Sequence, residues 1–134
     1  MELTLDQALQ KGIEAHKAGK VQEADRYYTA VLKAQPKNPE ANHNLGVLAV
    51  EIGKVKEALP YLRKALEIDP EKAQFWLSYI DALIKLDRLE DAKTVLSEAK
   101  NKGFSRQKLD VLDARIKELI KKVKLEEHTH YFKQ

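Results

Sequence analysis

Four histidines are the side chains in this 134-residue sequence whose chemistry could support catalysis or metal binding. His16 and His43 are isolated, because no serine or carboxylate occupies a helical neighbour position suited to a catalytic triad. The sequence has no glycine-rich phosphate-binding loop, because Gly12 and Gly19 lie at positions where they mark a helical hairpin. We therefore predict no catalytic residue and expect that the protein is not an enzyme.

The other two histidines define the only candidate metal ligands. His128 and His130 follow two glutamates near the C-terminus, and imidazole groups can bind a transition-metal ion. Nothing in the sequence fixes a third or fourth ligand, so this segment is interpreted as a polar tail. The absence of cysteine excludes a thiol nucleophile, a disulfide framework and a cysteine-based zinc site. No metal and no cofactor are predicted.

The distribution of charge is uneven along a chain of single-domain length. Residues 1–99 contain 14 basic and 16 acidic side chains, whereas residues 100–134 contain 10 basic and 5 acidic side chains. A basic segment could attract nucleic acid or an anionic membrane, but this excess is typical of a solvated helix with mixed charges. We therefore predict no nucleic-acid and no membrane partner. The acidic N-terminus lacks the order of a secretory signal, and we expect a cytoplasmic protein.

The elements that would position any site follow from a period of 34 residues. Each period contains two segments with the apolar spacing of amphipathic helices. The recurring residues are Gly12 with Gly46, Gly19 with Gly53, Ala24 with Ala58 and Ala92, and Pro36 with Pro70. A fixed period of this length predicts helical hairpins stacked into an array.

Local signals predict where the helices of this array begin. Thr4 followed by Gln7 predicts a capping box, and Asn38-Pro39 predicts an N-cap followed by proline at the first helical position. The third period departs from the pattern twice. Asp87 stands where the other periods have the turn glycine, and Ile80 replaces the glycine within the first helix, which favours a wider helix crossing there.

The sequence resembles the tetratricopeptide repeat family over about Leu5–Lys102. The residues that carry this resemblance are N-L-G in the first helix, a glycine before the second helix, A-L near its start and D-P at its end. Similar arrays occur alone or at the N-terminus of bacterial glycosyltransferase- and methyltransferase-type proteins. The resemblance implies an all-α, right-handed superhelical solenoid in one domain of residues 1–127. Its repeats would span about 5–38, 39–72 and 73–104, with a capping helix over about 105–127 and a C-terminal tail over 128–134.

The resemblance also implies a binding site, because the first helix of each hairpin lines a concave face in this family. By register, the groove residues are Leu9, Ile13, His16 and Lys17, then His43, Asn44, Val47, Val50 and Glu51, and finally Leu77, Ser78, Asp81, Ile84 and Lys85. An apolar centre within a polar rim suits an amphipathic helix or an extended apolar segment. Chaperone-binding members grip a C-terminal carboxylate with basic residues and asparagine. Here the matching positions are Leu9, Ile13, Asn44, Gln74 and Ser78, so that clamp is not predicted.

The apolar spacing of the last predicted helix is interpreted as a capping face through Leu109, Leu112 and Ile116. The helix is longer than one hairpin, so Leu119, Ile120 and Val123 are predicted to protrude and to support self-association, together with the aromatic end Tyr131-Phe132. We therefore expect a non-catalytic scaffold that binds a protein or peptide segment and can form a homo-oligomer. The alternative is the recruiting N-terminal segment of a larger enzyme, such as a glycosyltransferase or methyltransferase.

Overall fold

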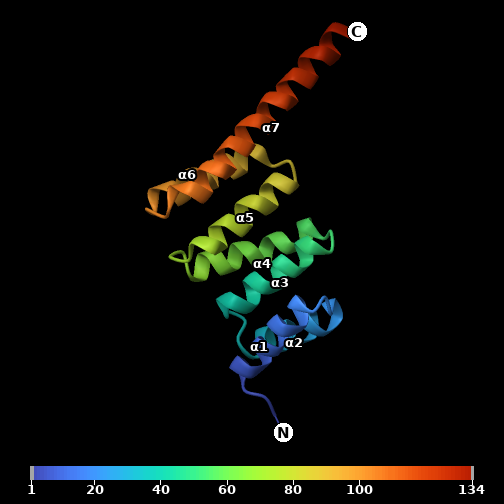
Figure 1. Cartoon of the computed structure of the whole chain (residues 1–134), viewed down its shortest axis with the longest axis vertical. Helices are drawn as coiled ribbons and strands as arrows, with labels where there is room; N and C mark the ends of the chain where they lie inside the picture. The colour runs from blue at the N-terminus through green and yellow to red at the C-terminus, as the bar shows by residue number, and fades with distance from the viewer. Residues whose placement is uncertain (1, 134) are drawn as a thin grey trace.

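The computed structural model describes residues 2–133, and it describes the side chains of residues 2–129. The regular structure in this part of the chain is entirely helical. The helices are α1 (Leu5–Lys17), α2 (Val21–Ala34), α3 (Pro39–Glu51), α4 (Val55–Ile68), α5 (Ala73–Lys85), α6 (Leu89–Asn101) and α7 (Arg106–Lys133). Figure 1 shows three antiparallel hairpins stacked along one axis, with α7 leaving the last hairpin. The predicted solenoid of three hairpins and a C-terminal helix is confirmed.

The starts of α1 and α3 follow the capping chemistry that the sequence predicts. The backbone N–H of Gln7 donates to the Thr4 hydroxyl at 3.1 Å, and the Thr4 N–H donates to the Gln7 side chain at 2.9 Å. The N–H of Ala41 donates to the Asn38 side chain at 2.9 Å, and Pro39 is the first residue of α3. Each contact satisfies N–H groups that the first turn of a helix cannot pair internally.

The turn within each hairpin requires one residue in the left-handed region. Gly19 has φ 75° and Gly53 has φ 83°, as expected for glycine in a tight turn. Asp87 occupies the equivalent position in the third hairpin with φ 57°. Aspartate adopts this conformation more readily than most residues, since its short side chain can form local hydrogen bonds. The third hairpin therefore keeps the same turn without a glycine.

The packing inside the hairpins explains the other recurring glycine. A Cβ atom on Gly46 would lie 2.6 Å from Cδ2 of Leu62, and one on Gly12 would lie 2.7 Å from Cε1 of Tyr28. Ile80, at the equivalent position, is fully buried. Helices α5 and α6 make less close backbone contact than the helices of the first two hairpins, because the isoleucine side chain lies between them.

Neighbouring hairpins are joined by the same hydrogen bond in two places. The Trp76 indole N–H donates to the Pro70 carbonyl at 2.7 Å, and the Asn42 amide donates to the Pro36 carbonyl at 3.1 Å. The two donors are 34 residues apart, as are the two acceptors, and both side chains are buried. Each contact fixes a proline turn against the helix that follows it.

The apolar core is divided along the array. The largest cluster extends from α4 to α7 and contains Leu62, Phe75, Leu83 and Ile116. Two small clusters lie among α1, α2 and α3, and their largest buried side chain is Tyr28. Apolar burial is thus concentrated in the C-terminal half of the array.

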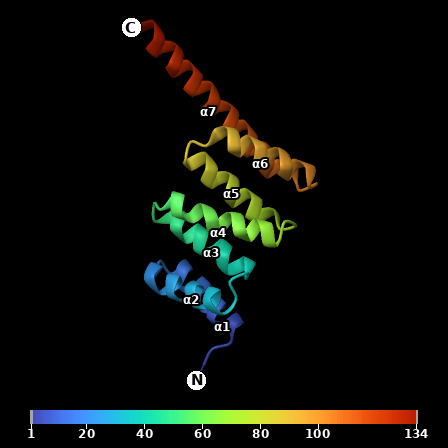
Figure 2. The ribbon, with the colours of Figure 1, turned by 180° about the vertical axis from the view of Figure 1, so that it is seen from behind.

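Helix α7 caps that half, and Figure 2 shows its base alongside α6. Leu109 and Ile116 are buried, and Leu112 is half-buried. Where the first helix of the third hairpin has Leu83 and Ile84 in the core, α7 has exposed Lys117 and Glu118 at the same register. A terminal element with a polar outer face is what a helical array requires.

The extent of α7 corrects the prediction of a helix ending near residue 127. It continues to Lys133, so the segment predicted as a tail over 128–134 is helical through that residue. The reason is that residues 104–133 contain no proline and no glycine, and many of them are strong helix formers. Among the described residues no helix combines the length and apolarity that crossing a bilayer requires.

Candidate functional site

A fourth helix lies beside the three helices that are predicted to line the concave face, and the sequence prediction omitted it. Arg115 of α7 donates to Asp81 of α5 at 2.9 Å, and these residues are 34 positions apart. Helix α7 therefore takes the place of the first helix of another hairpin. Its Lys108 and Val111 then correspond to Gln74 and Leu77 of α5. Extending the 34-residue register beyond residue 104 could have found them.

Adjacent concave helices are joined by three polar contacts, which we call the cross-repeat pairs. His16 Nε2 lies 2.7 Å from Glu51 Oε2, His43 Nε2 lies 2.8 Å from Ser78 Oγ, and Asp81 pairs with Arg115. The partners are 34 or 35 residues apart, so each contact links one helix to the equivalent helix of the next repeat. Each of these side chains therefore has a partner on the neighbouring helix.

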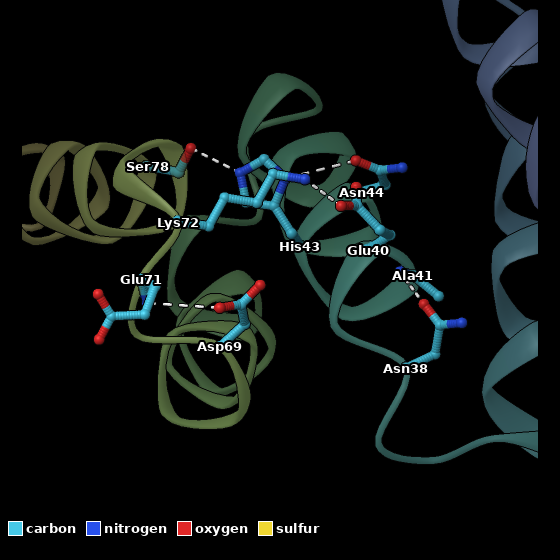
Figure 3. Close-up of polar contacts among 9 residues, drawn as sticks. All are labelled: Asn38, Glu40, Ala41, His43, Asn44, Asp69, Glu71, Lys72 and Ser78. Atoms are coloured by element: carbon cyan, nitrogen blue, oxygen red, sulfur yellow. Dashed lines mark hydrogen bonds and ion pairs between the residues drawn. The ribbon is translucent and has the colours of Figure 1, made fainter.

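His43 is the most buried polar group on this face, with 8% of its surface exposed. Its ring centroid lies 4.7 Å from that of Phe75, and its Nδ1 lies 3.4 Å from the Asn44 side-chain oxygen. Figure 3 shows Lys72 and Glu40 forming an ion pair beside the imidazole. Burial lowers the pKa of His43, and this outweighs the hydrogen bond to Asn44 and the charge of Glu40. A neutral ring fits these neighbours, with Nδ1–H donating to Asn44 and the Ser78 hydroxyl donating to Nε2.

The contact between His43 and Ser78 has the hydrogen bond that joins a catalytic nucleophile to its base. It lacks the other features of such a site. The third group in line is the Asn44 amide, which carries no charge to stabilise an imidazolium. Ser78 lies in the middle of α5, where the neighbouring backbone N–H groups form helical hydrogen bonds. They cannot form an oxyanion hole beside the hydroxyl. The contact is therefore best explained as a structural link between α3 and α5.

We expect stability to fall when the pH is lowered from about 7.5 to about 5, because His43 is buried in its neutral form. Its pKa is below the ordinary value of 6.5 in the folded state, so the unfolded chain binds the proton more readily. The stabilising contribution of neutral His43 is fully present above about pH 6.5, and it is lost as the pH falls below that value. Urea titrations at several pH values measure it.

The variant His43→Gln is the control, since it should flatten the pH dependence over this window. Asp113 does not interfere, because the hydrogen bond from Lys100 holds its carboxyl pKa below the ordinary value of 3.8. Its contribution is lost only at more acidic pH. An unfolding midpoint that stays constant from pH 7.5 to 5 in the native protein contradicts the prediction.

The predicted groove residues divide into three groups by exposure. Half-buried apolar side chains form the centre of the face, namely Leu9, Ile13, Val47, Val50 and Leu77. Lys17, Glu51 and Lys85 are exposed at its edge, and His16, Asn44, Ser78 and Asp81 are half-buried. His43 and Ile84 are buried. Ile84 corrects the prediction, because only 3% of its surface is exposed and it belongs to the large core cluster that includes Ile116 of α7. It is therefore not available at the groove surface.

Two separate pockets lie on this face. One has a volume of about 400 Å³ between α1 and α3, and its lining is mostly polar, with His16, Tyr28 and Glu51. The Tyr28 hydroxyl contacts His16 Nδ1 at 3.0 Å, and burial, followed by the charge of Glu51, raises the pKa of Tyr28 to about 12. The second pocket has a volume of about 340 Å³ and lies between α5 and α7.

The residues predicted for self-association are only partly uncovered. Leu119 and Ile120 are half-buried and pack against the large core cluster, which corrects the expectation that they protrude. Val123 is 42% exposed, and Leu125, which was not predicted, is 64% exposed. A cleft of about 730 Å³ separates this part of α7 from the start of α6. The side chains of His130, Tyr131 and Phe132 lie outside the described residues.

Comparison with known proteins identifies the repeated unit. Two family models described as tetratricopeptide repeat match residues 9–73 and 49–107. The chain is 35% identical over 65 residues to Hsp70-Hsp90 organizing protein 1 of Glycine max, a match that covers 48% of this chain and 11% of that protein. The chain thus spans about a tenth of that relative.

Solved structures show the same fold. The TPR2B domain of yeast Sti1 in a pHsp70 complex superposes with a TM-score of 0.79 at 21% identity, covering 86% of this chain and 97% of that one. An O-GlcNAc transferase mutant of Thermobaculum terrenum superposes with a TM-score of 0.68 at 29% identity, covering 76% of this chain and 20% of that one.

Proposed function

Since the chain belongs to the tetratricopeptide repeat family, we propose that it is a non-catalytic scaffold that binds a peptide or helical segment of another protein in its concave groove. The observation that carries the proposal is the row of half-buried apolar side chains at the centre of the concave face, represented by Ile13, Val47 and Leu77. A groove of this composition can bury the apolar face of a bound segment. The cross-repeat pairs support the proposal because they hold the groove in one conformation before binding.

The similarity to chaperone-associated proteins supports a protein partner, but not the same ligand. At the positions where chaperone-binding members place basic clamp residues, this chain has Leu9 and Ile13 in the first repeat. The carboxylates Glu51 and Glu40 nearby would repel a C-terminal carboxylate, although Lys72 pairs with Glu40. We therefore propose an internal segment of the partner as the ligand.

The double variant Val47→Lys and Leu77→Lys is expected to abolish capture of protein partners from a native lysate while leaving helicity intact. Both side chains are half-buried at the centre of the groove, where a lysine places an unpaired charge against the bound segment. The matched control is Leu3→Lys and Tyr61→Lys, which adds the same charge at exposed apolar positions outside the groove. If the groove variant retains every partner, the concave face is not the binding surface.

We also propose self-association through α7, supported by Val123, which lines the cleft of about 730 Å³ and is exposed, and by the exposed Leu125 on the same helix. Removing the residues after Glu118 should abolish concentration-dependent association in sedimentation equilibrium. Because this truncation also removes Leu119 and Ile120 from the core, Val123→Lys with Leu125→Lys in the full chain provides the test that leaves the core intact. A full chain that stays monomeric up to about millimolar concentration contradicts the proposal, since a contact of roughly −4 kcal/mol would be detected there.

The similarity to part of an O-GlcNAc transferase supports a second candidate function, in which the chain is a recruiting segment of a larger enzyme. In that case the same groove would bind the substrate protein rather than an independent partner. The natural gene sequence beyond Gln134 distinguishes the two, because a catalytic domain encoded there identifies the enzyme.

A further inference from the structure

The pocket between α5 and α7 differs in character from the rest of the concave face. Its apolar lining consists of Leu77 and Leu112, both half-buried, together with Val111, which is 64% exposed. The polar residues of its lining are Gln74, Ser78, Asp81 and Lys108. Few exposed apolar side chains in the described part of the protein are as open as Val111. A volume of about 340 Å³ is near the lower limit of ligand pockets, and it suits one or two side chains better than a whole helix.

The charges around this pocket are unequal. Asp81 is already paired with both Lys85 and Arg115, so it offers no free negative charge. Lys108, on the α7 side of the pocket, forms no ion pair with the described side chains. Elsewhere on the face, Glu51 pairs with His16 and Glu40 pairs with Lys72. The pocket therefore combines an apolar floor with one free cation at its edge.

The α7 wall of the pocket is held in place by the core. Leu109 and Ile116, on the inner side of the same helix, are at most 2% exposed. Arg115 ties the helix to α5 on the concave side through Asp81. A wall fixed on both sides presents Val111 and Lys108 at a constant spacing, which favours specific recognition over adaptive contact.

We propose that this pocket binds an apolar side chain of an extended peptide segment in a partner protein, with the carboxylate of an adjacent peptide residue placed at Lys108. This inference rests on the proposed function, since it names the class of segment that the concave groove selects. The apolar side chain covers Val111 and Leu77, and the carboxylate supplies the anion that Lys108 lacks. The recognised segment is thus apolar and acidic at neighbouring positions.

The experiment measures binding of fluorescein-labelled octapeptide pools by fluorescence polarisation. Two adjacent positions are fixed as Leu-Glu, Leu-Lys, Ala-Glu or Ala-Lys, and the other positions are randomised. The Leu-Glu pool is expected to bind most tightly. Replacing Leu by Ala should weaken binding roughly tenfold or more, because three carbon atoms are no longer buried. Replacing Glu by Lys should weaken it roughly two- to fivefold, since the pair is exposed.

Variants assign each preference to one residue. Val111→Ser should remove the preference for Leu over Ala, whereas Leu125→Ser, at an equally exposed position of α7, should keep it. Lys108→Glu should invert the preference from Glu to Lys, and Lys122→Glu, outside this pocket, should not. All four substitutions are at exposed positions, so the fold is expected to be retained.

The outcomes separate this inference from the proposed function. Equal binding of the four pools overturns the inference, and so does a preference for glutamate that Lys108→Glu leaves unchanged. If the pools bind equally and the Val47→Lys and Leu77→Lys double variant abolishes that binding, the groove is the binding surface and the inference alone is wrong. If no pool binds the native protein up to about millimolar concentration, the inference is overturned, and capture of partners from lysate by the native protein and the groove variant still decides the proposed function.

Discussion

Trp76→Ala is expected to lower the free energy of unfolding by about 3–5 kcal/mol. The indole is only 6% exposed, and its ring centroid lies 6.4 Å from that of Phe104 in the segment leading to α7. Alanine leaves a cavity between the third hairpin and this segment, and it also leaves the Pro70 carbonyl without its donor. Urea denaturation followed by far-UV circular dichroism measures the loss.

Two further variants separate packing from hydrogen bonding. Trp76→Phe keeps most of the ring but removes the N–H, so it should cost about 1–3 kcal/mol. Asn42→Ala removes the equivalent donor to the Pro36 carbonyl, and we expect a loss of similar size from it. If Trp76→Phe is as harmful as Trp76→Ala, the hydrogen bond rather than the volume of the ring stabilises this junction.

Ala58→Leu is expected to destabilise the protein by about 1–3 kcal/mol, because the larger side chain enters a site that is already filled. Ala58 has no exposed surface and belongs to the large core cluster. Leu62, one turn later on α4, is also fully buried and closely packed against Gly46, so it cannot move aside. The thermal unfolding midpoint, measured by circular dichroism, should fall.

Ala30→Leu provides the matched control, since Ala30 is an exposed alanine within α2. Both substitutions add the same three carbon atoms to a helical position, and leucine and alanine have similar helix propensities. The control should therefore leave the midpoint almost unchanged. Equal midpoints for the native protein and the Ala58 variant would show that the helices of the second hairpin do not meet at this alanine.

The architecture could be predicted from the sequence because its signals are local or periodic. The side-chain cap at Thr4, the Asn38-Pro39 start and the left-handed turn at Gly53 each depend on chemistry within a few residues. The 34-residue period then placed equivalent residues of different hairpins on the same face. Asp87 was recognised as a departure from the pattern, but its turn conformation depends on the hairpin that encloses it.

The site was less predictable because its geometry depends on contacts between repeats. The pairing of His43 with Ser78 joins residues 35 positions apart, so a search for partners on the same helix misses it. Ile84 satisfies the register of a groove residue, yet it is buried in the core cluster that α7 completes. The place of α7 in the concave face depends on tertiary packing. The 34-residue period is only weakly visible in the sequence of this helix, in matches such as Leu77 with Val111.

The division of the core into one large cluster and two small ones has a consequence for local opening. In an array where each repeat contacts only its neighbours, the repeat with least apolar burial opens at the lowest free energy. Hydrogen exchange should therefore be faster for the amides of α1 and α2 than for those of α5 and α6. A segment bound across Leu9 and Leu77 would link the two halves, and part of its binding free energy would offset the cost of ordering the N-terminal hairpin.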